Sequence, residues 1–263
     1  MNIIVCIKQV PGTTQVEIDE KTGVMKRDTG SAKMNPYDLY AIETALRIKE
    51  ELIDVQTTAI TMGPPQSEAV LREAYMLGID HGILLTDRKF GGADCLATAY
   101  TLSQAILKIG LPDLIICGKQ TTDGDTAQVG SELAEFLELP HIACVLKINS
   151  LTNRSLEGVM DLGDFTQTVE LPFPCLITVD KEIYEPRLPS YRKKIATRDR
   201  PIQTLSFSEL PDQNPVHYGL DGSATRVMRV FPPVHHKQNQ IFEGTPDTLA
   251  SEISKILIKM KVL

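Results

Sequence analysis

The residues best suited to bind a small charged molecule lie between positions 118 and 130, where the sequence reads GKQTTDGDTAQVG. Apolar residues 114–117 come directly before this stretch and predict a buried parallel strand. Residues 131–138 follow with the apolar spacing of a helix. Because the first N–H groups of a helix lack backbone partners and attract anions, this junction predicts an anion or nucleotide site. A plain polar connection is the alternative.

Three glycines and two acids refine this prediction. Gly118, Gly124 and Gly130 carry no side chain where a phosphate would have to approach. The stretch is neither a GxGxxG fingerprint nor a Walker A loop, since no GK[ST] occurs. Asp123 and Asp125 could form a carboxylate pair for acid–base chemistry. Acids at a helix start also favour the helix dipole, and one could hold a ribose or flavin edge, which is the interpretation we prefer.

Elsewhere the chain lacks the spacings of familiar catalytic and metal sites. No Ser-His-Asp spacing, nucleophile elbow or HExxH motif occurs. The five cysteines include no CxxC pair, and Cys6, Cys117 and Cys175 sit inside strand-like apolar runs. We therefore expect buried, reduced thiols and no bound metal.

The polar stretch needs a strand before it and a helix after it, and such pairs recur along the first two-thirds of the chain. Asn35 is the expected N-cap of one helix, Pro36 its first residue and Asp38 the acid of a capping box. The order predicts an α/β fold with a mainly parallel, Rossmann-like sheet, whose ligands bind outside the carboxyl ends of the strands. Strands are expected at 3–7, 55–62, 82–86 and 114–117, and further helices at 67–77, 94–107 and 131–137.

The character of the sequence changes in its last third. Residues 145–179 read as short strands and turns, a possible antiparallel addition to the sheet. Residues 187–244 hold many prolines and little periodicity, which favours an arm that leaves the domain and lies on a partner. A terminal helix begins after Thr245, and packing on its own sheet is the alternative to packing on a partner. We expect a nucleotide-binding domain at 1–186 and an arm with a terminal helix at 187–263.

Composition excludes some functions. The chain has 263 residues, with 27 Lys plus Arg against 34 Asp plus Glu, and a net charge of -7. An acidic chain argues against general nucleic-acid binding, which requires a basic surface. No apolar run is long enough for a membrane span. The amino terminus reads as a strand rather than a signal peptide, so we expect a cytoplasmic protein.

Five segments in order along the chain resemble the β subunit of electron transfer flavoproteins, over essentially its whole length. The resemblance implies the fold of adenine-nucleotide hydrolases and universal stress proteins. It also implies an αβ heterodimer. The α subunit of that family holds FAD, and the β subunit holds a second nucleotide, AMP in ordinary members and FAD in electron-bifurcating members. The matching segments are residues 5–11 (VCIKQVP), 34–38 (MNPYD) with 43–46 (ETAL), 62–64 (MGP), 118–128 (GKQTTDGDTAQ) and 185–187 (EPR).

The resemblance also assigns the nucleotide contacts. Gly124 bears on the choice of ligand, because ordinary members tend to have an acid there, whereas bifurcating members read DGDTAQVG as this chain does. A glycine leaves room and removes a negative charge beside a pyrophosphate, so the resemblance favours FAD over AMP. The implied contacts are Cys6, Lys8, Asn35, Pro36, Tyr37, Asp38, Met62, Gly63, Asp94, Thr98, Gly118, Lys119, Gln120, Thr121, Thr122, Asp123, Gly124, Asp125, Thr126, Ala127, Gln128 and Val129.

A basic segment after the EPR motif resembles the family's recognition loop for acyl-CoA dehydrogenases. Tyr191 aligns with the residue that enters the dehydrogenase pocket, which is usually leucine. An aromatic anchor ringed by charges is a typical hot spot, although a solvated basic loop is the alternative. The implied docking residues are Arg187, Tyr191, Arg192, Lys193 and Lys194.

The function implied by the resemblance is electron transfer within a larger oxidoreductase complex. A flavin must carry the electrons, because no protein side chain here can do so. In the bifurcating type, NADH or NAD⁺ meets the β-subunit FAD, and electrons pass to a flavin-containing dehydrogenase and to ferredoxin or flavodoxin. Two alternatives remain: an ordinary β subunit with structural AMP, and a non-redox nucleotide-binding module of the stress-protein kind.

Overall fold

The computed structural model of the chain describes residues 1–12, 17–18, 25–26, 32–228 and 241–262. Two compact units, Met1–Met228 and Arg229–Leu263, divide the chain, and each is described by itself.

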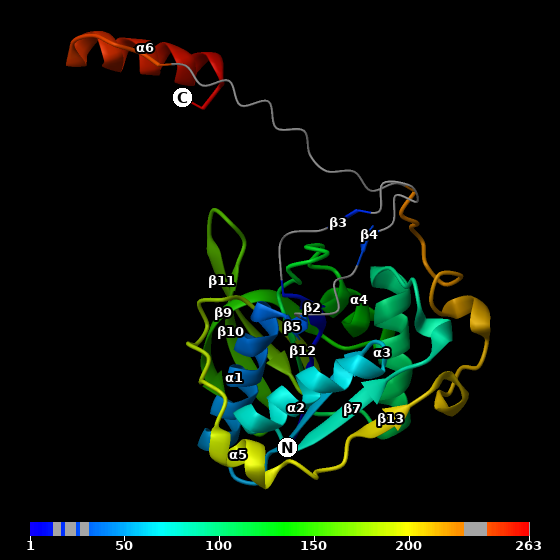
Figure 1. The fold of residues 1–263 in the computed structure, drawn as a ribbon. Helices are drawn as coiled ribbons and strands as arrows, with labels where there is room; N and C mark the ends of the chain where they lie inside the picture. The colour runs from blue at the N-terminus through cyan, green and yellow to red at the C-terminus, as the bar shows by residue number, and fades with distance from the viewer. Residues whose placement is uncertain (13–16, 19–24, 27–31, 229–240, 263) are drawn as a thin grey trace. The chain divides into compact units, whose positions relative to one another are not determined.

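A nine-stranded sheet forms the centre of the first unit, in the order β11-β10-β9-β12-β8-β1-β6-β7-β13 (Figure 1). From β9 to β13 in that order the strands run parallel, while β10 is antiparallel to both β9 and β11. The predicted α/β fold with a mainly parallel sheet is confirmed, as is the antiparallel addition. The strands are β1 Asn2–Cys6, β6 Gln56–Met62, β7 His81–Leu85, β8 Leu114–Gly118, β9 His141–Leu151, β10 Ser155–Asp161, β11 Thr166–Pro172, β12 Cys175–Val179 and β13 Gln203–Leu205.

Helices cover both faces of this sheet and create two cores. Alternate residues of β1 point to opposite faces: Ile3 and Val5 join one core, and Ile4 and Cys6 join the other. Helices α1 (Pro36–Glu51) and α2 (Glu68–Leu77) pack on the first face. Helices α3 (Cys95–Ile109) and α4 (Val129–Phe136) pack on the second. Strands β1, β8 and β12 are apolar nearly throughout because both of their faces are buried, whereas β6 also buries Thr57 and Thr61.

Short elements lie beside the main sheet. Strands β2 (Gln9–Pro11) and β5 (Ala32–Met34) form an antiparallel pair, as do β3 (Glu17–Ile18) and β4 (Met25–Lys26). The predicted helix at 67–77 begins one residue later, because Pro65–Ser67 forms a 3-10 turn.

Residues 187–228 belong to the first unit, which ends at Met228 rather than at the expected boundary after residue 186. Helix α5 (Tyr191–Ala196) packs against α2, and β13 extends the main sheet beside β7. Phe207, Leu210 and Tyr218 are then buried in the second core. The segment is irregular in sequence because short pieces of it fill separate places on the domain, and none is long enough to show periodicity.

The second unit contains helix α6 (Pro246–Lys259), which starts where the sequence predicts. The Thr245 side chain caps it by accepting a hydrogen bond from the Thr248 N–H. None of the residues of α6 is buried. In the described parts of both units, no helix has the length and apolar character that crossing a membrane requires.

Candidate functional site

The carboxyl ends of β1 and β8 bring several predicted site residues together, and Asn35 connects them. Its side-chain Nδ2 donates to the Gln120 carbonyl at 2.9 Å, and its Oδ1 accepts from the Thr122 N–H at 3.2 Å. Asn35 precedes α1 as expected, but its side chain does not cap the helix. The amide is instead committed to the loop that follows β8, and it fixes the path of that loop.

Asp38 lies beneath this loop and is 4% exposed. Its carboxylate accepts a hydrogen bond from the Lys8 N–H at 2.6 Å and one from Asn35 Nδ2 at 2.8 Å. Burial raises the pKa of Asp38 from 3.8 to about 7, against the lowering effect of these hydrogen bonds. The capping-box role expected for Asp38 is therefore wrong, since the carboxylate joins α1 to the end of β1.

An ion pair spans the mouth of the site. Lys8 Nζ lies 2.8 Å from both carboxylate oxygens of Asp123. Burial alone would raise the pKa of Asp123, but the hydrogen bond and charge of Lys8 bring it below its usual value. Asp125 in turn accepts a hydrogen bond from Gln120. The two acids are thus held by neighbours, which weakens the case for a free acid–base pair.

Two residues of the loop have a positive φ. Asp125 and Ala127 both have φ of 54°, a left-handed conformation that is uncommon outside glycine. The N–H groups of Thr122, Gly124 and Asp125 already donate to Asn35, Asp123 and Thr121 respectively, so an anion would have to use N–H groups further along the loop. Helix α4 begins at Val129, and its first N–H groups have no partners within the helix. Residues 122–128 are exposed, so a ligand can reach them.

The three glycines of the loop differ in why they are needed. A Cβ on Gly118 would lie 2.6 Å from Asp38 Oδ1, and one on Gly130 would lie 2.5 Å from Thr178 Cγ2. Packing within the chain therefore requires those two glycines. A Cβ on Gly124 would meet only Thr121 Oγ1 at 3.5 Å, an ordinary contact. Nothing in the described residues requires glycine at 124, which fits a ligand that needs the space.

Other predicted contacts surround the loop without reaching into it. Lys119 turns away, because its Nζ pairs with Asp180 at 2.7 Å and that carboxylate raises its pKa. The Cys6 thiol is buried beside Cys117, whose pKa it raises. The Gly63 N–H donates to the Leu85 carbonyl at the end of β7. Half-buried positions on adjoining elements are Pro36, Tyr37, Met62, Thr98 and Val129.

The start of α3 forms the second wall of the site. The Asp94 side chain caps α3 through the Ala97 N–H and accepts from Thr225 N–H and Oγ1 at 2.8 and 3.0 Å. Burial alone would raise the pKa of Asp94, but these hydrogen bonds bring it below its usual value. Cys95 Sγ lies 3.1 Å from Thr126 Oγ1, which links α3 to the loop. Sequence patterns missed Thr225, since no local signal joins residues 131 positions apart.

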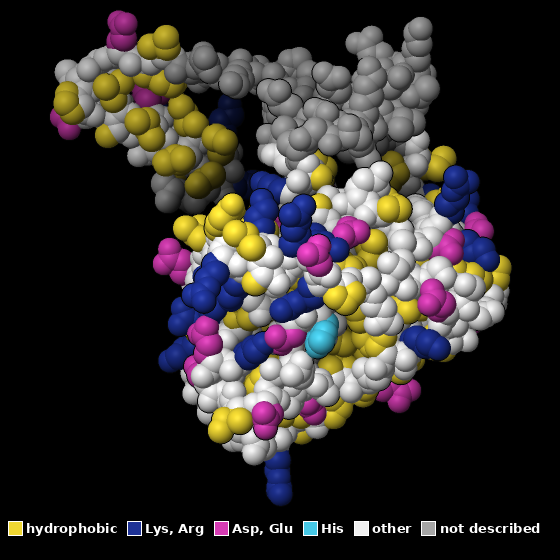
Figure 2. All heavy atoms as spheres, turned by 60° about the horizontal axis from the view of Figure 1, so that its bottom comes forward, with side chains coloured by type: hydrophobic (Ala, Val, Ile, Leu, Met, Phe, Trp, Pro, Cys, Tyr) yellow, Lys and Arg dark blue, Asp and Glu magenta, His cyan; other side chains and the backbone are white. Residues whose placement is uncertain are grey.

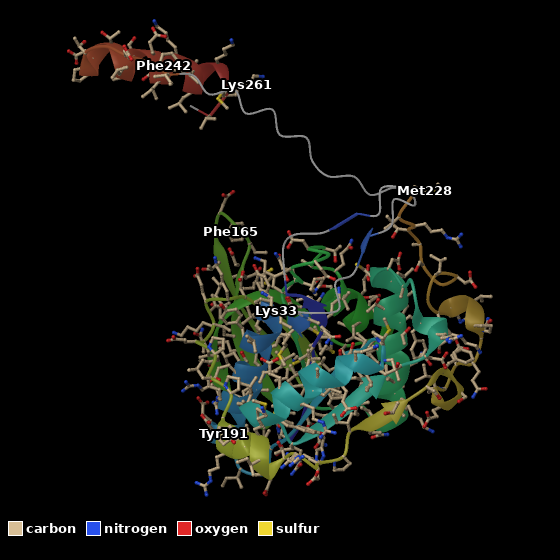
Figure 3. The ribbon with its side chains drawn as sticks, in the orientation of Figure 1. Lys33, Phe165, Tyr191, Met228, Phe242 and Lys261 are labelled. Atoms are coloured by element: carbon tan, nitrogen blue, oxygen red, sulfur yellow. The ribbon has the colours of Figure 1, made fainter. Side chains whose placement is uncertain are left out.

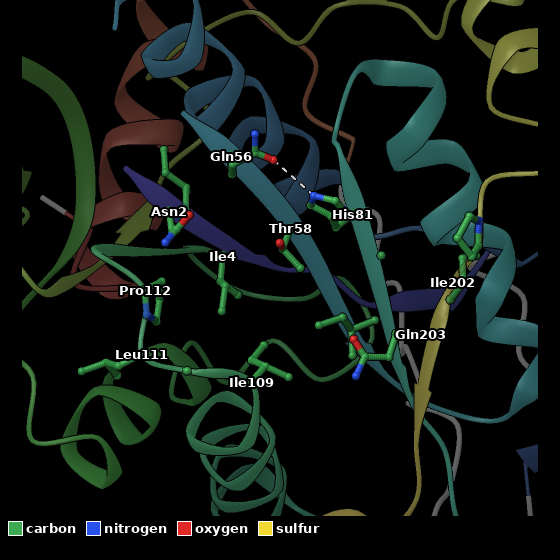
Figure 4. Close-up of a pocket in the computed structure, with 15 residues that line it drawn as sticks. Asn2, Ile4, Gln56, Thr58, His81, Ile109, Leu111, Pro112, Ile202 and Gln203 are labelled. Atoms are coloured by element: carbon green, nitrogen blue, oxygen red, sulfur yellow. Dashed lines mark hydrogen bonds between the residues drawn. The ribbon is translucent and has the colours of Figure 1, made fainter. Parts of the chain in front are cut away.

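A separate hollow of about 600 Å³ lies at the opposite, amino-terminal edge of the sheet (Figure 4). Ile4, Ile83 and Ile109 line it, together with polar side chains such as His81 and Gln203. No Lys, Arg, Asp or Glu is among its lining residues. It therefore offers no cation for a phosphate, in contrast to the edge that carries Lys8.

The predicted docking residues fall into two groups. Arg187 is held by Glu43 at 2.7 Å and by Glu50 at 2.8 Å, and Lys193 Nζ donates to the Leu77 carbonyl at 2.9 Å. These two act within the domain. Tyr191 is 74% exposed on α5, at the lower left of Figure 3, and Arg192 and Lys194 are exposed beside it. No group of His, Cys, Asp or Glu among the described residues is arranged to hold a metal ion.

Comparison with known proteins identifies the family. The electron transfer flavoprotein domain matches residues 22–210 of this chain. The chain belongs to the electron transfer flavoprotein family. Two similar proteins are the electron transfer flavoprotein subunit beta of Megasphaera elsdenii, 36% identical over 99% of this chain and 98% of that protein, and the caffeyl-CoA reductase-Etf complex subunit CarD of Acetobacterium woodii, 38% identical over 97% and 98%.

A third relative of this electron transfer flavoprotein chain carries a different title. The acryloyl-CoA reductase electron transfer subunit gamma of Anaerotignum propionicum is 36% identical over 100% of both chains. The expected resemblance to the β subunit of this family is confirmed. The chain is thus a β-like subunit of the kind found in electron-transfer complexes.

Proposed function

We propose that this chain is the β subunit of a heterodimeric electron transfer flavoprotein and binds FAD at the carboxyl ends of β1 and β8. The observation that carries the proposal is Gly124, where the chain's own packing leaves room for a side chain and none is present. An acid at this position would stand beside a pyrophosphate and repel it. The ordinary AMP-binding type is the alternative.

The residues around the loop have separate roles in this proposal. The backbone of residues 126–128 and the start of α4 would hold the pyrophosphate. Asn35 keeps the loop in place from below, and Lys8 offsets the charge of Asp123. A bound flavin supplies hydride and single-electron transfer, which protein side chains do not provide. This chain binds and orients it.

The proposal extends to the partners. NADH or NAD⁺ would reach the flavin of this chain, and electrons would pass to a flavin-containing dehydrogenase and to ferredoxin or flavodoxin. Relatives titled as parts of caffeyl-CoA and acryloyl-CoA reductases support a dehydrogenase or reductase that acts on acyl-CoA thioesters. We propose that residues 187–263 supply much of the contact with the α subunit and the dehydrogenase.

Counting nucleotides tests the proposal. The chain is co-expressed with its α subunit, the complex is denatured in acid, and released FAD and AMP are separated by chromatography. We expect two FAD per heterodimer. One FAD with one AMP would replace the bifurcating assignment with the ordinary type, and one FAD with no second nucleotide would remove the site altogether.

Substitution of Gly124 then tests the placement of the ligand. In Gly124→Asp, a like charge about 5 Å from the pyrophosphate costs about 3 kcal/mol at an effective dielectric near 20, before relaxation. We expect loss of one FAD per heterodimer and retention of the other. Gly124→Ala is the matched control, because it adds a Cβ without charge. Equal flavin content in Gly124→Asp and wild type would reject this placement.

A further inference from the structure

A groove lies between α2 and α5, on the side of the domain where the basic segment packs. Its lining residues are Arg72, Met76, Lys194, Thr197 and Arg198, and its volume is about 210 Å³. Figure 2 brings the lower end of Figure 1 forward and shows lysine and arginine side chains gathered on the left of that face. The walls are mostly apolar, because the stems of the long cationic side chains and Met76 form them.

The groove is held open by contacts within the domain. The Ser190 N–H donates to the Met76 carbonyl at 3.1 Å, which joins the start of α5 to α2. The Arg72 guanidinium donates to Glu68 at 2.8 Å and to the Arg200 carbonyl at 2.6 Å, so contacts within the domain hold it in place. The shape therefore exists without any partner.

Three other cationic side chains lie around the groove and are not held by an ion pair of this kind. Arg192, Lys194 and Arg198 are exposed, and none forms an ion pair with another residue that the structure describes. Lys194 and Arg198 are four residues apart in sequence and line the same groove. Their charges stand out on a chain with a net charge of -7. A ligand for this rim must carry negative charge.

Apolar side chains extend the same surface outward. Leu188, Tyr191 and Ile195 are 88%, 74% and 61% exposed. Tyr191 and Ile195 are four residues apart on α5 and so share one face of it. An apolar groove beside exposed apolar side chains, ringed by cations, has the composition of a protein-binding hot spot.

We propose that this groove receives an apolar side chain that projects from an acidic surface of the dehydrogenase. The carboxylates around that side chain pair with Arg192, Lys194 and Arg198. The inference rests on the proposed docking function, and it adds a pocket on this chain that accepts an anchor from the other protein. Tyr191 contributes an anchor in the opposite direction, so the two surfaces interlock.

A peptide probe tests this pocket without knowledge of the dehydrogenase. The full chain, in complex with its α subunit, is labelled with ¹³C at the methionine methyl groups. Acetyl-Asp-Glu-Leu-Glu-Asp-amide is the probe, and the same peptide with serine in place of leucine is its control. We expect the leucine peptide to shift the Met76 methyl signal, and the serine peptide to bind about tenfold more weakly. Equal binding of both peptides, or no binding, would overturn the proposal.

Two variants test separately how the pocket and how the charges contribute to peptide binding. Met76→Trp fills the groove and should weaken binding of the leucine peptide, measured by fluorescence anisotropy, by about tenfold. Lys194→Gln with Arg198→Gln should mainly reduce the salt dependence of binding. Leu111→Trp, in the other hollow, is the control and should leave binding unchanged. Binding unaffected by Met76→Trp would refute the groove as the binding site. A low FAD count would refute only the proposed flavin site, since the peptide needs no flavin.

Discussion

Gly118 holds two elements together because it lacks a side chain. It ends β8 where the start of α1 crosses, and a Cβ there would lie 2.7 Å from the Tyr37 carbonyl carbon and 2.6 Å from Asp38 Oδ1. Backbone cannot yield as a side chain can, so α1 and β8 would have to separate. If α1 and β8 separated in this way, Asp38 and the loop above it would move as well.

Gly118→Ala should therefore destabilise the domain by about 1–3 kcal/mol, the usual cost of added volume in a packed site. The free energy of unfolding would be measured in urea. Gly124→Ala is the matched control, with an expected change within about 0.5 kcal/mol, because its Cβ meets only one ordinary contact. Equal losses in the two variants would contradict this difference.

Asp38 should make the stability of the domain fall as pH rises. Its pKa is raised from 3.8 to about 7 in the folded state, so the folded chain binds an additional proton between those values. Stability contributed by this proton is complete below pH 4 and is lost as pH passes 7, a span of about 4 kcal/mol. Asp38→Asn removes the titration.

Urea unfolding at several pH values tests this sign. The difference in unfolding free energy, wild type minus Asp38→Asn, should decrease from pH 4 to pH 8. Asp123→Asn provides the opposite case, because the pKa of Asp123 is lowered and its contribution is lost as pH falls. Two difference curves of the same slope would show that Asp38 is ionised in the fold like an ordinary acid.

Residues of the site differ in how far the sequence could reveal them. Asn35 could be placed before α1 from its type and from Pro36, and that position is correct. Its hydrogen bonds to Gln120 and Thr122 lie 85 and 87 residues away in sequence. Capping rules describe neighbours within one turn of a helix, so they assigned the side-chain oxygen to the wrong donor, a helix N–H instead of the Thr122 N–H.

At the scale of elements, long periodic segments were predictable and short ones were not. Four parallel strands and the helices between them follow from apolar runs and caps, and the structure contains them. Strand β13 has three residues and was missed, since a run of that length shows no alternation. Its place beside β7 depends on Leu205, Phe207 and Tyr218 filling a core formed by distant residues.

Arg187 connects the segment after β12 to α1, and it should matter for stability. Glu43 is 1% exposed and accepts three hydrogen bonds from Arg187 and one from Arg47. Burial would raise the pKa of Glu43, but these hydrogen bonds bring it below its usual value. Arg187→Met leaves a buried carboxylate with one cation, at an expected cost of about 3 kcal/mol.

Urea unfolding would measure that cost, with Arg192→Met as the control. Arg192 is exposed on α5, and its substitution should change stability by less than about 0.5 kcal/mol. Similar stability of the two variants would show that Arg187 does not stabilise the domain, which would leave it the docking role alone.

At the scale of the whole molecule, the second unit presents exposed apolar side chains on helix α6. Helix α6 has no buried residue, and Ile253, Ile258 and Met260 are 53%, 63% and 67% exposed. A helix of 14 residues is marginal in water unless an apolar face is packed. Sequence alone predicted the helix, but not whether the chain itself or another protein covers it.

Hydrogen exchange should resolve α6 at the scale of the assembly. In the chain alone, we expect its amides to exchange nearly as fast as those of an unstructured peptide. In complex with the α subunit, they should exchange at least tenfold more slowly, as burial of the apolar face stabilises the helix. Strands β1 and β8 serve as the internal reference, protected in both preparations. Equal exchange of α6 in both would show that the α subunit does not cover it.

The exposed apolar side chains of α6 also have a consequence for how much of this chain a cell can hold. If the α subunit covers the helix, copies in excess of that subunit would each display Ile253, Ile258 and Met260 to the solvent. Exposed apolar surface promotes aggregation and recognition by quality-control machinery, and aggregation increases with concentration. In that case the helix requires matched synthesis of the two proteins, and imbalance between them should appear as loss of the surplus chain.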